Sequence, residues 1–299
     1  MLICDTHADT LWAMATGKTR LDLTPDMLTN PADTRVQALA LFVSTGGMAQ
    51  RPTIVERELA VFEDLKAKGQ LRQITRVEDA RPGRANVLLT IEGGEAFGDA
   101  LDGVERMAAL GVRMAALTWN NENAIGHPAK GGSPEGLKPF GRQVVAEMRR
   151  LHMAVDISHL NARGTAEVMD SDIPPLASHS CVYALCPHYR NLTDGQLRAL
   201  FRCGGYVGVN FYPGFLSPEG TATLDTLADH MAYLCDLGGE KQIGLGSDFD
   251  GGIEPYPVGL HRACDLPALL DAMRRRGFSR ELILDIAGRN FQRYMRRIE

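Results

Sequence analysis

The start of the chain carries the first residues suited to chemistry. A short apolar run over residues 1–4 leads into Asp5-Thr6-His7-Ala8-Asp9. Because side chains alternate between the two faces of a strand, His7 and Asp9 are expected to point the same way. An imidazole beside a carboxylate at the end of a buried strand makes half of a metal site. A His-x-Asp pair is also common by chance, so the alternative is a strand whose polar end is merely solvated.

Further polar residues follow later apolar runs, and six of them have types suited to a metal centre. They are three histidines and three carboxylates, His7, Asp9, Glu92, His159, His179 and Asp248. Taken singly, each has an ordinary explanation as a helix cap or a hydrogen-bonded structural histidine. If they converge, however, the carboxylates would destabilise one another unless cations lay between them.

The types of these ligands indicate which metal they would hold. Imidazole and carboxylate without thiolate suit Zn²⁺, with Mn²⁺ and Fe²⁺ as alternatives. The first five of these residues, His7 to His179, are too many ligands for one catalytic ion that keeps an open position. They suit two ions that share a carboxylate. Some two-metal barrels bridge their ions with a carboxylated lysine, but no lysine here follows a predicted strand. Glu92 is therefore the predicted bridge. Two ions ~3.5–4 Å apart can hold a bridging hydroxide as nucleophile and polarise a carbonyl.

Eight apolar runs are typical of strands covered on both faces, and they must position these residues. The predicted strands span residues 2–6, 35–43, 86–91, 113–118, 153–157, 176–178, 206–210 and 242–246. Helical periodicity lies between them, for example at Val55, Leu59 and Phe62. Further helices are predicted over 139–151, 161–169, 266–276 and 279–294. Thr193 begins a capping box for a helix to about residue 200, and residues 11–31 are expected to be irregular with a helical turn or two.

Eightfold alternation of strand and helix predicts parallel strands with right-handed crossovers. The predicted fold is α/β, a single TIM-type (β/α)8 barrel that takes up residues 1–299 as one domain. Reactive residues of such barrels lie at the carboxyl ends of the strands, where the six candidates fall. The alternative is an open doubly wound sheet. That fold usually carries a glycine-rich loop after its first strand, which residues 5–9 do not resemble.

The same stretches resemble the membrane (renal) dipeptidase family, metallopeptidase family M19, and in particular its bacterial members. The matching blocks, in the family's order, are Asp5-x-His7-x-Asp9, Ile91-Glu92-Gly93-Gly94, Gly136-Leu137-x-x-Phe140-Gly141, Asp156-Ile157-Ser158-His159, Ala177-Ser178-His179-Ser180, Arg190-Asn191, Val209-Asn210-Phe211 and Gly246-Ser247-Asp248-Phe249-Asp250-Gly251. The resemblance runs essentially end to end. It implies a barrel of the metal-dependent hydrolase kind, a two-zinc site and hydrolysis of dipeptides.

Residue by residue, the resemblance implies that His7 and Asp9 hold one ion and that His159 and His179 hold the other, bridged by Glu92. It further implies that Asp248 is the catalytic general acid/base and that Arg190 receives the terminal carboxylate of the substrate. Without the matching block, Arg190 would be read as part of a surface salt bridge. The remaining histidines, His152, His188, His230 and His261, are assigned to packing, surface or supporting positions.

One position departs from the family. Eukaryotic members carry a substrate-contacting histidine after the fourth strand, where this chain has Trp119. An indole N–H can donate a hydrogen bond but cannot be charged, and loss of an oxyanion donor can cost ~10²–10³ in rate. Either Trp119 or a neighbour such as Asn120, Asn123 or His127 replaces that donor, or the substrate differs from an ordinary dipeptide. The alternative for Trp119 is a pocket wall. Trp119, Asn120 and, after the seventh strand, Tyr212 are predicted to bind substrate.

Composition narrows the class of partner. The hydrophobic fraction is 44%, the charged fraction 23% and the net charge −5, with no basic patch that would suggest nucleic acid. No apolar run reaches the ~18 residues of a membrane span. The start lacks the basic region of a signal peptide, and the six cysteines form no CxxC. A cytoplasmic protein with reduced thiols is expected.

The predicted function is that of a two-zinc dipeptidase acting on dipeptides with a free C-terminal carboxylate. One alternative is a related amide hydrolase, acting on N-acyl amino acids or lactones. The other is a metal-binding protein without turnover, against which Asp248 and Arg190 argue, because a protein that only binds needs no acid/base. The family resemblance also suggests a homodimer.

Overall fold

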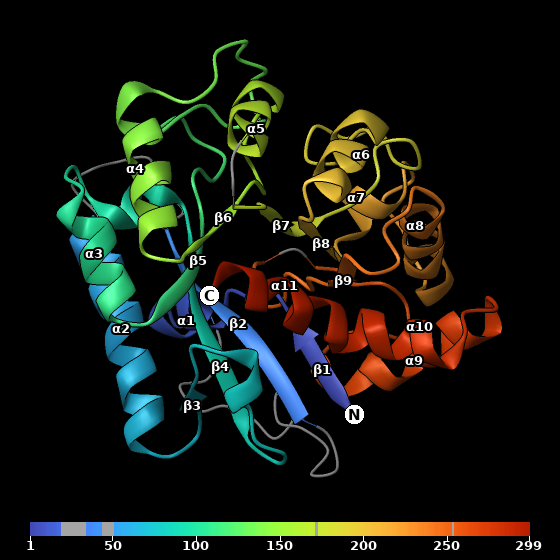
Figure 1. The fold of residues 1–299 in the computed structure, drawn as a ribbon. Helices are drawn as coiled ribbons and strands as arrows, with labels where there is room; N and C mark the ends of the chain where they lie inside the picture. Colours follow the sequence, from blue (N-terminus) through green and yellow to red (C-terminus); the bar gives the residue numbers. More distant parts are fainter. Residues whose placement is uncertain (19–33, 44–50, 171–172, 253) are drawn as a thin grey trace.

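Eight parallel strands close into a barrel in the computed structural model, which describes residues 1–18, 34–43, 51–170, 173–252 and 254–299 (Figure 1). Their order around the barrel is β1-β2-β4-β5-β6-β7-β8-β9, and β9 pairs with β1 through Leu245 and Asp5. The strands are β1 (Leu2–Asp5), β2 (Thr34–Phe42), β4 (Ala85–Glu92), β5 (Val112–Ala116), β6 (Ala154–Asp156), β7 (Leu176–Ser180), β8 (Tyr206–Val209) and β9 (Ile243–Leu245). The predicted (β/α)8 barrel is confirmed.

One short strand was not predicted. β3 (Arg72–Gln73) pairs with the start of β4, where Arg72 lies opposite Asn86. On that side of β4 the pairing with β5 begins only at Leu89. β3 has no apolar run, so its sequence carries no strand signal.

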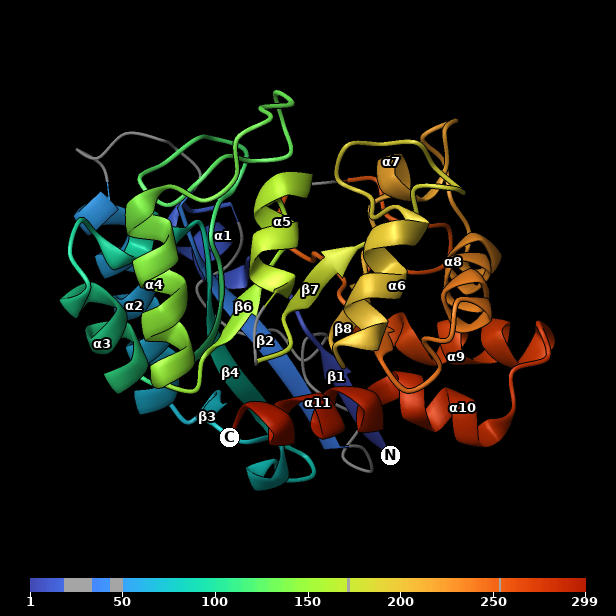
Figure 2. The same cartoon turned by 45° about the horizontal axis from the view of Figure 1, so that its top comes forward.

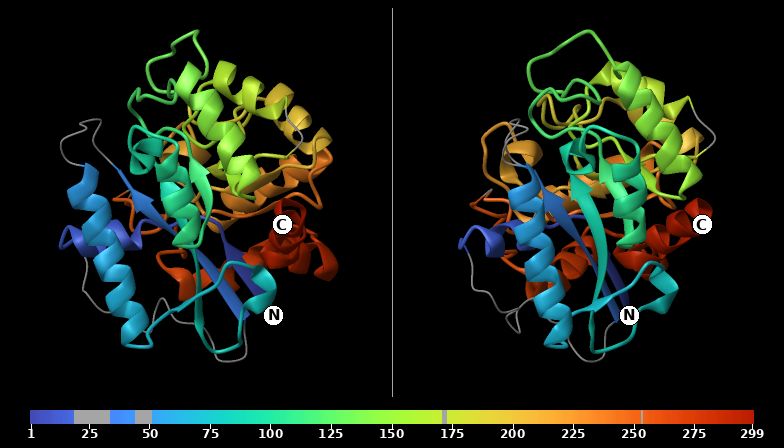
Figure 3. Two further views of the ribbon diagram at one scale, coloured as in Figure 1. Left: turned by 60° about the vertical axis from the view of Figure 1, so that its left-hand side comes forward. Right: turned by 90° about the vertical axis from the view of Figure 1, so that its left-hand side faces the viewer.

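Helices surround the barrel, as Figures 1 and 2 show. They are α1 (Thr10–Ala15), α2 (Arg51–Ala67), α3 (Asp102–Ala109), α4 (Pro139–Arg150), α5 (Ala162–Met169), α6 (Asp194–Arg202), α7 (Pro213–Leu216), α8 (Leu224–Asp236), α9 (Leu266–Arg275), α10 (Arg280–Leu284) and α11 (Asn290–Ile298), with the short turns η2 (Val77–Asp79), η3 (Gly94–Phe97) and η4 (Ala263–Asp265) and the π-helical η5 (Asp285–Arg289). Figure 3 shows α2 running alongside the barrel wall near β4. No helix among the described residues is both long and apolar enough to cross a membrane.

The buried apolar residues form two clusters, and the smaller of them lies inside the barrel. One cluster joins side chains from β1, β2, β4, β5, β6, β7 and β8, including Cys4, Leu88 and Tyr206, which can meet only inside the barrel. Phe291 and Tyr294 of α11 belong to the same cluster. Figure 2 accordingly shows α11 across the end of the barrel where the strands begin. That end is closed by apolar packing, so chemistry is left to the opposite end.

The predicted helix starts are largely confirmed. Thr193 caps α6 with the expected capping box, and Asn161 caps α5 by accepting from the Gly164 amide at 2.8 Å. The helix predicted over 279–294 is interrupted by η5, where the carbonyl oxygen of Leu2 lies 2.9 Å from the place a Cβ on Gly288 would occupy. That turn therefore brings the helix backbone against β1. Of the irregular segment predicted over 11–31, α1 supplies a helical turn, and residues 19–33 lie outside the described residues.

Candidate metal centre

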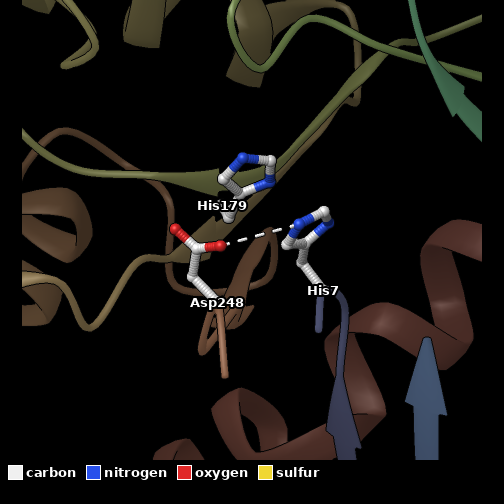
Figure 4. Close-up of side chains that lie close together, drawn as sticks. All are labelled: His7, His179 and Asp248. Carbon is white, nitrogen blue, oxygen red and sulfur yellow. Dashed lines mark ion pairs between the residues drawn. The ribbon is translucent and has the colours of Figure 1, made fainter. Parts of the chain in front are cut away.

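The six predicted metal-centre residues come together at the carboxyl end of the barrel. His7 and Asp9 follow β1, Glu92 ends β4 and His179 belongs to β7. His159 follows β6, and Asp248 follows β9. All six side chains are buried. Figure 4 shows His7, His179 and Asp248 facing one another from three separate segments.

Glu92 lies between two groups of ligands. Its Oε1 is 2.9 Å from Nε2 of His159 and 3.3 Å from Nε2 of His179. Its Oε2 is on the other side, 3.7 Å from Nε2 of His7, which is itself 3.5 Å from Oδ1 of Asp9. One carboxylate thus presents each oxygen to a different set of ligand atoms, which is the position required of a bridge.

The hydrogen bonds around the ligands show that the residues fit bound cations. Oδ1 of Asn120 lies 3.0 Å from Nδ1 of His159. Because an amide oxygen only accepts, Nδ1 carries the proton and Nε2 presents its lone pair toward Glu92. Among the described residues, Nε2 of His7 and Oδ1 of Asp9 are buried without a hydrogen-bond partner. Buried nitrogen and carboxylate oxygen atoms that have no hydrogen-bond partner are suited to metal ions.

Burial and neighbouring charges shift the pKa values of the ligands. Burial, with the charge of Asp9, raises the pKa of Glu92 to about 8. Burial alone would lower the pKa of His7, but the carboxylates of Glu92 and Asp9 raise it well above its ordinary value. Burial, with the positive charges of His7 and Arg190, lowers the pKa of His159 and of His179 well below the ordinary value. These two imidazoles are therefore neutral, the form that binds metal.

Asp248 is held in a demanding geometry. Its backbone φ is +63°, a left-handed conformation that few residues other than glycine adopt. The Asp248 amide donates to the His7 carbonyl at 3.1 Å, and Oδ2 accepts from Nδ2 of Asn210 at 2.9 Å. Oδ1 is 3.6 Å from Nε2 of His7 and so faces the ligands. Such conformations persist where surrounding contacts enforce them, and they cluster at functional sites.

Arg190 brings a buried positive charge to the same end of the barrel. Its Nη2 donates to the His179 carbonyl oxygen at 3.1 Å, and its guanidinium lies 5.5 Å from the Phe215 ring. Burial lowers the pKa of Arg190, while the charges of Asp248 and Glu92 raise it. Its Nε is buried with no hydrogen-bond partner among the described residues. The guanidinium therefore keeps donor capacity for another acceptor.

Three residues predicted to bind substrate occupy different surroundings. Trp119 is half-buried, with its ring 6.2 Å from that of His159 and 5.2 Å, edge to face, from that of Phe42. Asn120 is engaged with His159, so its oxygen supports a predicted ligand. Tyr212 is half-buried and meets Phe215 edge to face at 4.9 Å. Their contacts with a substrate stay a prediction.

The two other candidates for the oxyanion donor are occupied differently. Asn123 holds its own loop, since its Nδ2 donates to the Leu117 carbonyl at 2.9 Å and its Oδ1 accepts the Ile125 and Gly126 amides. His127 lies between two carboxylates, 3.5 Å from Glu122 and 3.5 Å from Glu135.

No role was predicted for the residues that support the site. Asn210 holds Asp248, and Asp156 holds Ser178 beside His179. Glu58 of α2 is also buried, and its Oε1 accepts the Phe42 amide at 3.1 Å. Burial, with the charges of Asp9 and Glu92, raises the pKa of Glu58 well above its usual value. A signal existed for Glu58, because it falls on the apolar helix face defined by Val55, Leu59 and Phe62.

The whole chain, residues 1–299, matches the family described as membrane dipeptidase, peptidase family M19. The chain belongs to this family. The predicted family and the predicted class of enzyme, a metallopeptidase, are thereby confirmed. This M19 peptidase matches its relatives over most of its length. It is 35% identical over 263 residues to an uncharacterized protein in the pqqA 5′ region of Klebsiella pneumoniae, across 82% of this chain and 96% of that one.

The fungal relatives are longer. The chain is 36% identical over 223 residues to the dipeptidase aclJ of Aspergillus oryzae, across 73% of this chain and 53% of that protein. It is 39% identical over 195 residues to an uncharacterized dipeptidase of Schizosaccharomyces pombe, across 64% of this chain and 47% of that protein. The match thus spans about half the length of these fungal proteins.

Solved structures share the architecture of this M19 peptidase. The crystal structure of the dipeptidase AC, a metallopeptidase of family M19, superposes with a TM-score of 0.90 at 28% identity, covering 99% of this chain and 98% of that one. A metallopeptidase from Rhodobacter sphaeroides, liganded with a phosphinate mimic of the dipeptide L-Ala-D-Ala, superposes with a TM-score of 0.88 at 27% identity, covering 100% and 99%.

Proposed function

We propose that this M19 peptidase hydrolyses dipeptides that carry a free C-terminal carboxylate, with two zinc ions bound at the carboxyl end of the barrel. The observation that carries the proposal is the position of Glu92, whose two oxygens face separate sets of ligand atoms. Mn²⁺ and Fe²⁺ suit the same ligand types and are the alternatives.

The ligands divide into two sets that share Glu92. His7, Asp9 and Glu92 offer atoms within 4.8 Å of one another, and so do Glu92, His159 and His179. Each set would hold one ion. When bound, two such ions supply an activated water at neutral pH and polarise the scissile carbonyl.

Asp248 is the residue suited to moving the proton. Peptide hydrolysis must deliver a proton to the leaving amine, and a positioned carboxylate contributes ~10²–10⁴ to such a step. Asn210 orients Oδ2 of Asp248, and Oδ1 faces the ligands. Burial raises the pKa of Asp248, although the charge of His7 opposes the shift. The carboxyl is therefore disposed to take up a proton and pass it on.

Arg190 is the residue suited to reading the substrate's carboxylate. A guanidinium makes two parallel, charge-assisted hydrogen bonds to a carboxylate, and these place the neighbouring peptide bond at a set distance. In a dipeptide the free carboxylate lies one residue from the scissile bond. Arg190 would therefore select dipeptides over longer peptides. The Rhodobacter sphaeroides relative is liganded with a mimic of L-Ala-D-Ala, and L,D-dipeptides therefore belong in the substrate set.

The test is a paired assay of kcat/KM on a dipeptide and on its C-terminal amide. We expect the wild type to prefer the free acid strongly and Arg190→Ala to lose that preference. Arg198→Ala removes an exposed arginine of α6 and serves as the matched control, which should keep the preference. Equal rates on acid and amide with wild type would refute the dipeptidase assignment. N-Acetyl-alanine belongs in the same assay, because faster turnover of it than of dipeptides would favour an N-acyl-amino-acid hydrolase.

A further inference from the structure

His179 is the ligand whose orientation depends on a chain of two further side chains. Its Nδ1 lies 2.7 Å from Oγ of Ser178, and Oγ of Ser178 makes a short hydrogen bond to Oδ2 of Asp156. All three residues are buried. Nε2 of His179 points the other way, toward Oε1 of Glu92.

Asp156 is fixed by backbone contacts on two strand ends. Its Oδ1 accepts the Ser158 amide at 2.9 Å and the Ser178 amide at 3.0 Å. As a carboxylate, Asp156 can only accept, so the Ser178 hydroxyl must donate its single proton to Oδ2. Oγ of Ser178 then has only lone pairs left for its other neighbours.

The direction of the Ser178 hydroxyl decides the tautomer of His179. Since Oγ of Ser178 has no second proton, Nδ1 of His179 must be the donor in the 2.7 Å contact. The proton therefore sits on Nδ1, and the lone pair sits on Nε2. The nearby Ser158 hydroxyl, 3.4 Å from Oγ of Ser178, can use the remaining lone pair without disturbing this order.

We infer that Asp156 and Ser178 are positioning residues that hold His179 in the Nδ1–H tautomer, so that Nε2 is free to bind a metal ion. The inference rests on the proposed metal site. Partners of this kind around metal-ligating histidines typically change metal affinity roughly 10- to 100-fold when removed.

The barrel contains a second copy of the same arrangement that touches no imidazole. Oδ1 of Asp5 accepts the Ser247 amide at 2.8 Å and the His7 amide at 3.4 Å, and Oδ2 accepts the Ser247 hydroxyl at 2.5 Å. The Ser247 hydroxyl also lies 3.2 Å from the His7 carbonyl. Asp5 and Ser247 therefore provide matched control positions within the same fold.

The decisive variant is Asp156→Asn, which preserves the shape of the side chain. It should reverse the direction of the two hydrogen bonds in the relay that runs from Asp156 through Ser178 to His179. The side-chain oxygen of the asparagine would stay with the two backbone amides, because a flipped amide would place N–H groups against N–H groups. Its NH₂ would then face Oγ of Ser178 as a donor, and the Ser178 proton would turn to Nδ1 of His179. The ring would be left with its proton on Nε2, where a metal ion must bind.

The test uses the full chain with ¹⁵N-labelled histidine, stripped of metal and shown by circular dichroism to remain folded. Long-range ¹H–¹⁵N spectra report the tautomer, and His179 is assigned by the signals lost in His179→Gln. We expect Nδ1–H in wild type, Nε2–H in Asp156→Asn, and no change of the His179 tautomer in Asp5→Asn. An Nε2–H ring in wild type, or an unchanged ring in Asp156→Asn, would overturn the inference.

Zinc affinity, measured by competition with a chromophoric chelator, is the second readout. One of two zinc equivalents should weaken roughly 10- to 100-fold in Asp156→Asn and in Ser178→Ala. Unchanged affinity in both variants would also overturn the inference. If the tautomer switches but the chain binds no zinc, the relay stands and the proposed function fails. If two zinc ions bind but the tautomer does not switch, the relay fails and the proposed function stands.

Discussion

Individual side chains at the carboxyl end of the barrel accept more than they donate. The carboxylates of Asp9, Glu92 and Asp248 meet there, and the lone pairs of His159 and His179 point to the same oxygen of Glu92. Buried carboxylates close together raise one another's pKa values, as Asp9 and Asp248 do for Glu92. At the scale of residues, the site is therefore suited to bound cations.

Replacing Asp248 tests the assignment of the proton carrier. In Asp248→Asn we expect kcat to fall by ~10²–10⁴, because the amide cannot exchange a proton with the leaving amine. Zinc content should stay near that of wild type. Steady-state kinetics with elemental analysis provide the measurement.

The matched control is Asp250→Asn, two residues further on. Asp250 accepts from the Thr10 hydroxyl at 2.6 Å and so already has a partner within the fold. We expect this variant to lose much less activity. If Asp250→Asn is the slower of the two, Asp250 is the proton carrier and the assignment of Asp248 is wrong.

At the scale of elements, β7, β8 and β9 pack closely around the Thr6 side chain. The Thr6 hydroxyl lies 2.6 Å from the Ser178 carbonyl oxygen and 2.8 Å from the Leu245 carbonyl oxygen, which share its single proton, so it joins β7 and β9 beneath the site. Gly208 of β8 faces this junction, and a Cβ there would overlap the Ser178 carbonyl and the Thr6 hydroxyl. Only glycine at position 208 leaves room for the contact between the Thr6 hydroxyl and the Ser178 carbonyl.

Gly208→Ala should therefore destabilise the fold by about 1–3 kcal/mol, the usual cost of overpacking. It should also weaken zinc binding, because Ser178 precedes His179. The control is Gly195→Ala in α6, where the nearest atom to a new Cβ is Oγ1 of Thr193 at 4.0 Å. Gly195→Ala should be neutral or stabilising by ~0.4–1 kcal/mol. Equal unfolding free energies for the two variants in urea would contradict this account.

His230 joins α8 to α7 and to the loop after β7, on the side of the barrel that carries Arg190. It lies on α8, its Nδ1 accepts the Val182 amide at 3.2 Å, and its Nε2 donates to the Leu216 carbonyl of α7 at 2.9 Å. Burial lowers its pKa, because protonating Nδ1 would break the bond from Val182 and bury a charge. The predicted packing role of this histidine agrees with these contacts.

The sign of the pH dependence follows from that lowered pKa. Below the ordinary pKa near 6.5, the unfolded chain takes up a proton at His230 that the folded chain does not. Stability should therefore fall as pH drops from 7.5 to 5.5, by at most about 1.4 kcal/mol per pH unit from this group. In metal-free protein, His230→Gln should be less stable at pH 7.5 but lose less on acidification. The control is His261→Gln, at an exposed position, which should behave like wild type. Identical pH profiles of unfolding free energy for wild type, His230→Gln and His261→Gln would contradict a lowered pKa of His230.

At the scale of the whole molecule, the metal ligands join distant parts of the chain. They come from β4, from β7 and from the segments after β1 and β6, so bound ions would connect strands around much of the barrel. A ligand that binds only the folded state stabilises it, by ~4 kcal/mol at a concentration 1,000 times its Kd. Removing metal should therefore lower Tm.

Glu92→Gln should reverse the order of stability between the two metal states. In zinc, wild type should have the higher Tm, because the variant lacks the bridging carboxylate. Without metal, the variant should have the higher Tm, because it is freed from burying a carboxylate beside Asp9 and Asp248. Scanning calorimetry of both proteins with zinc and with chelator measures the two differences. The same order in both conditions would argue against Glu92 as the bridge.

Much of this protein was determined by local sequence. Eight apolar runs identified the strands of the barrel, because each strand is buried on both faces and reads as a continuous apolar segment. Residue types at the strand ends identified the six side chains of the centre. Thr193 and Asn161 marked helix starts, because capping depends on residues only a few positions apart.

What depends on contacts between distant segments was decided only by the tertiary structure. The sequence contained Asp156, Ser178 and Asn210, but their partners lie across neighbouring strands, so no spacing predicted the tautomer of His179 or the hold on Asp248. The engagement of Asn120 with His159 spans 39 positions in the chain. The interruption of the last helix likewise follows from its approach to β1 at Gly288. Local patterns specify elements and residue types, whereas the direction of each proton and lone pair is set by neighbours that only folding brings together.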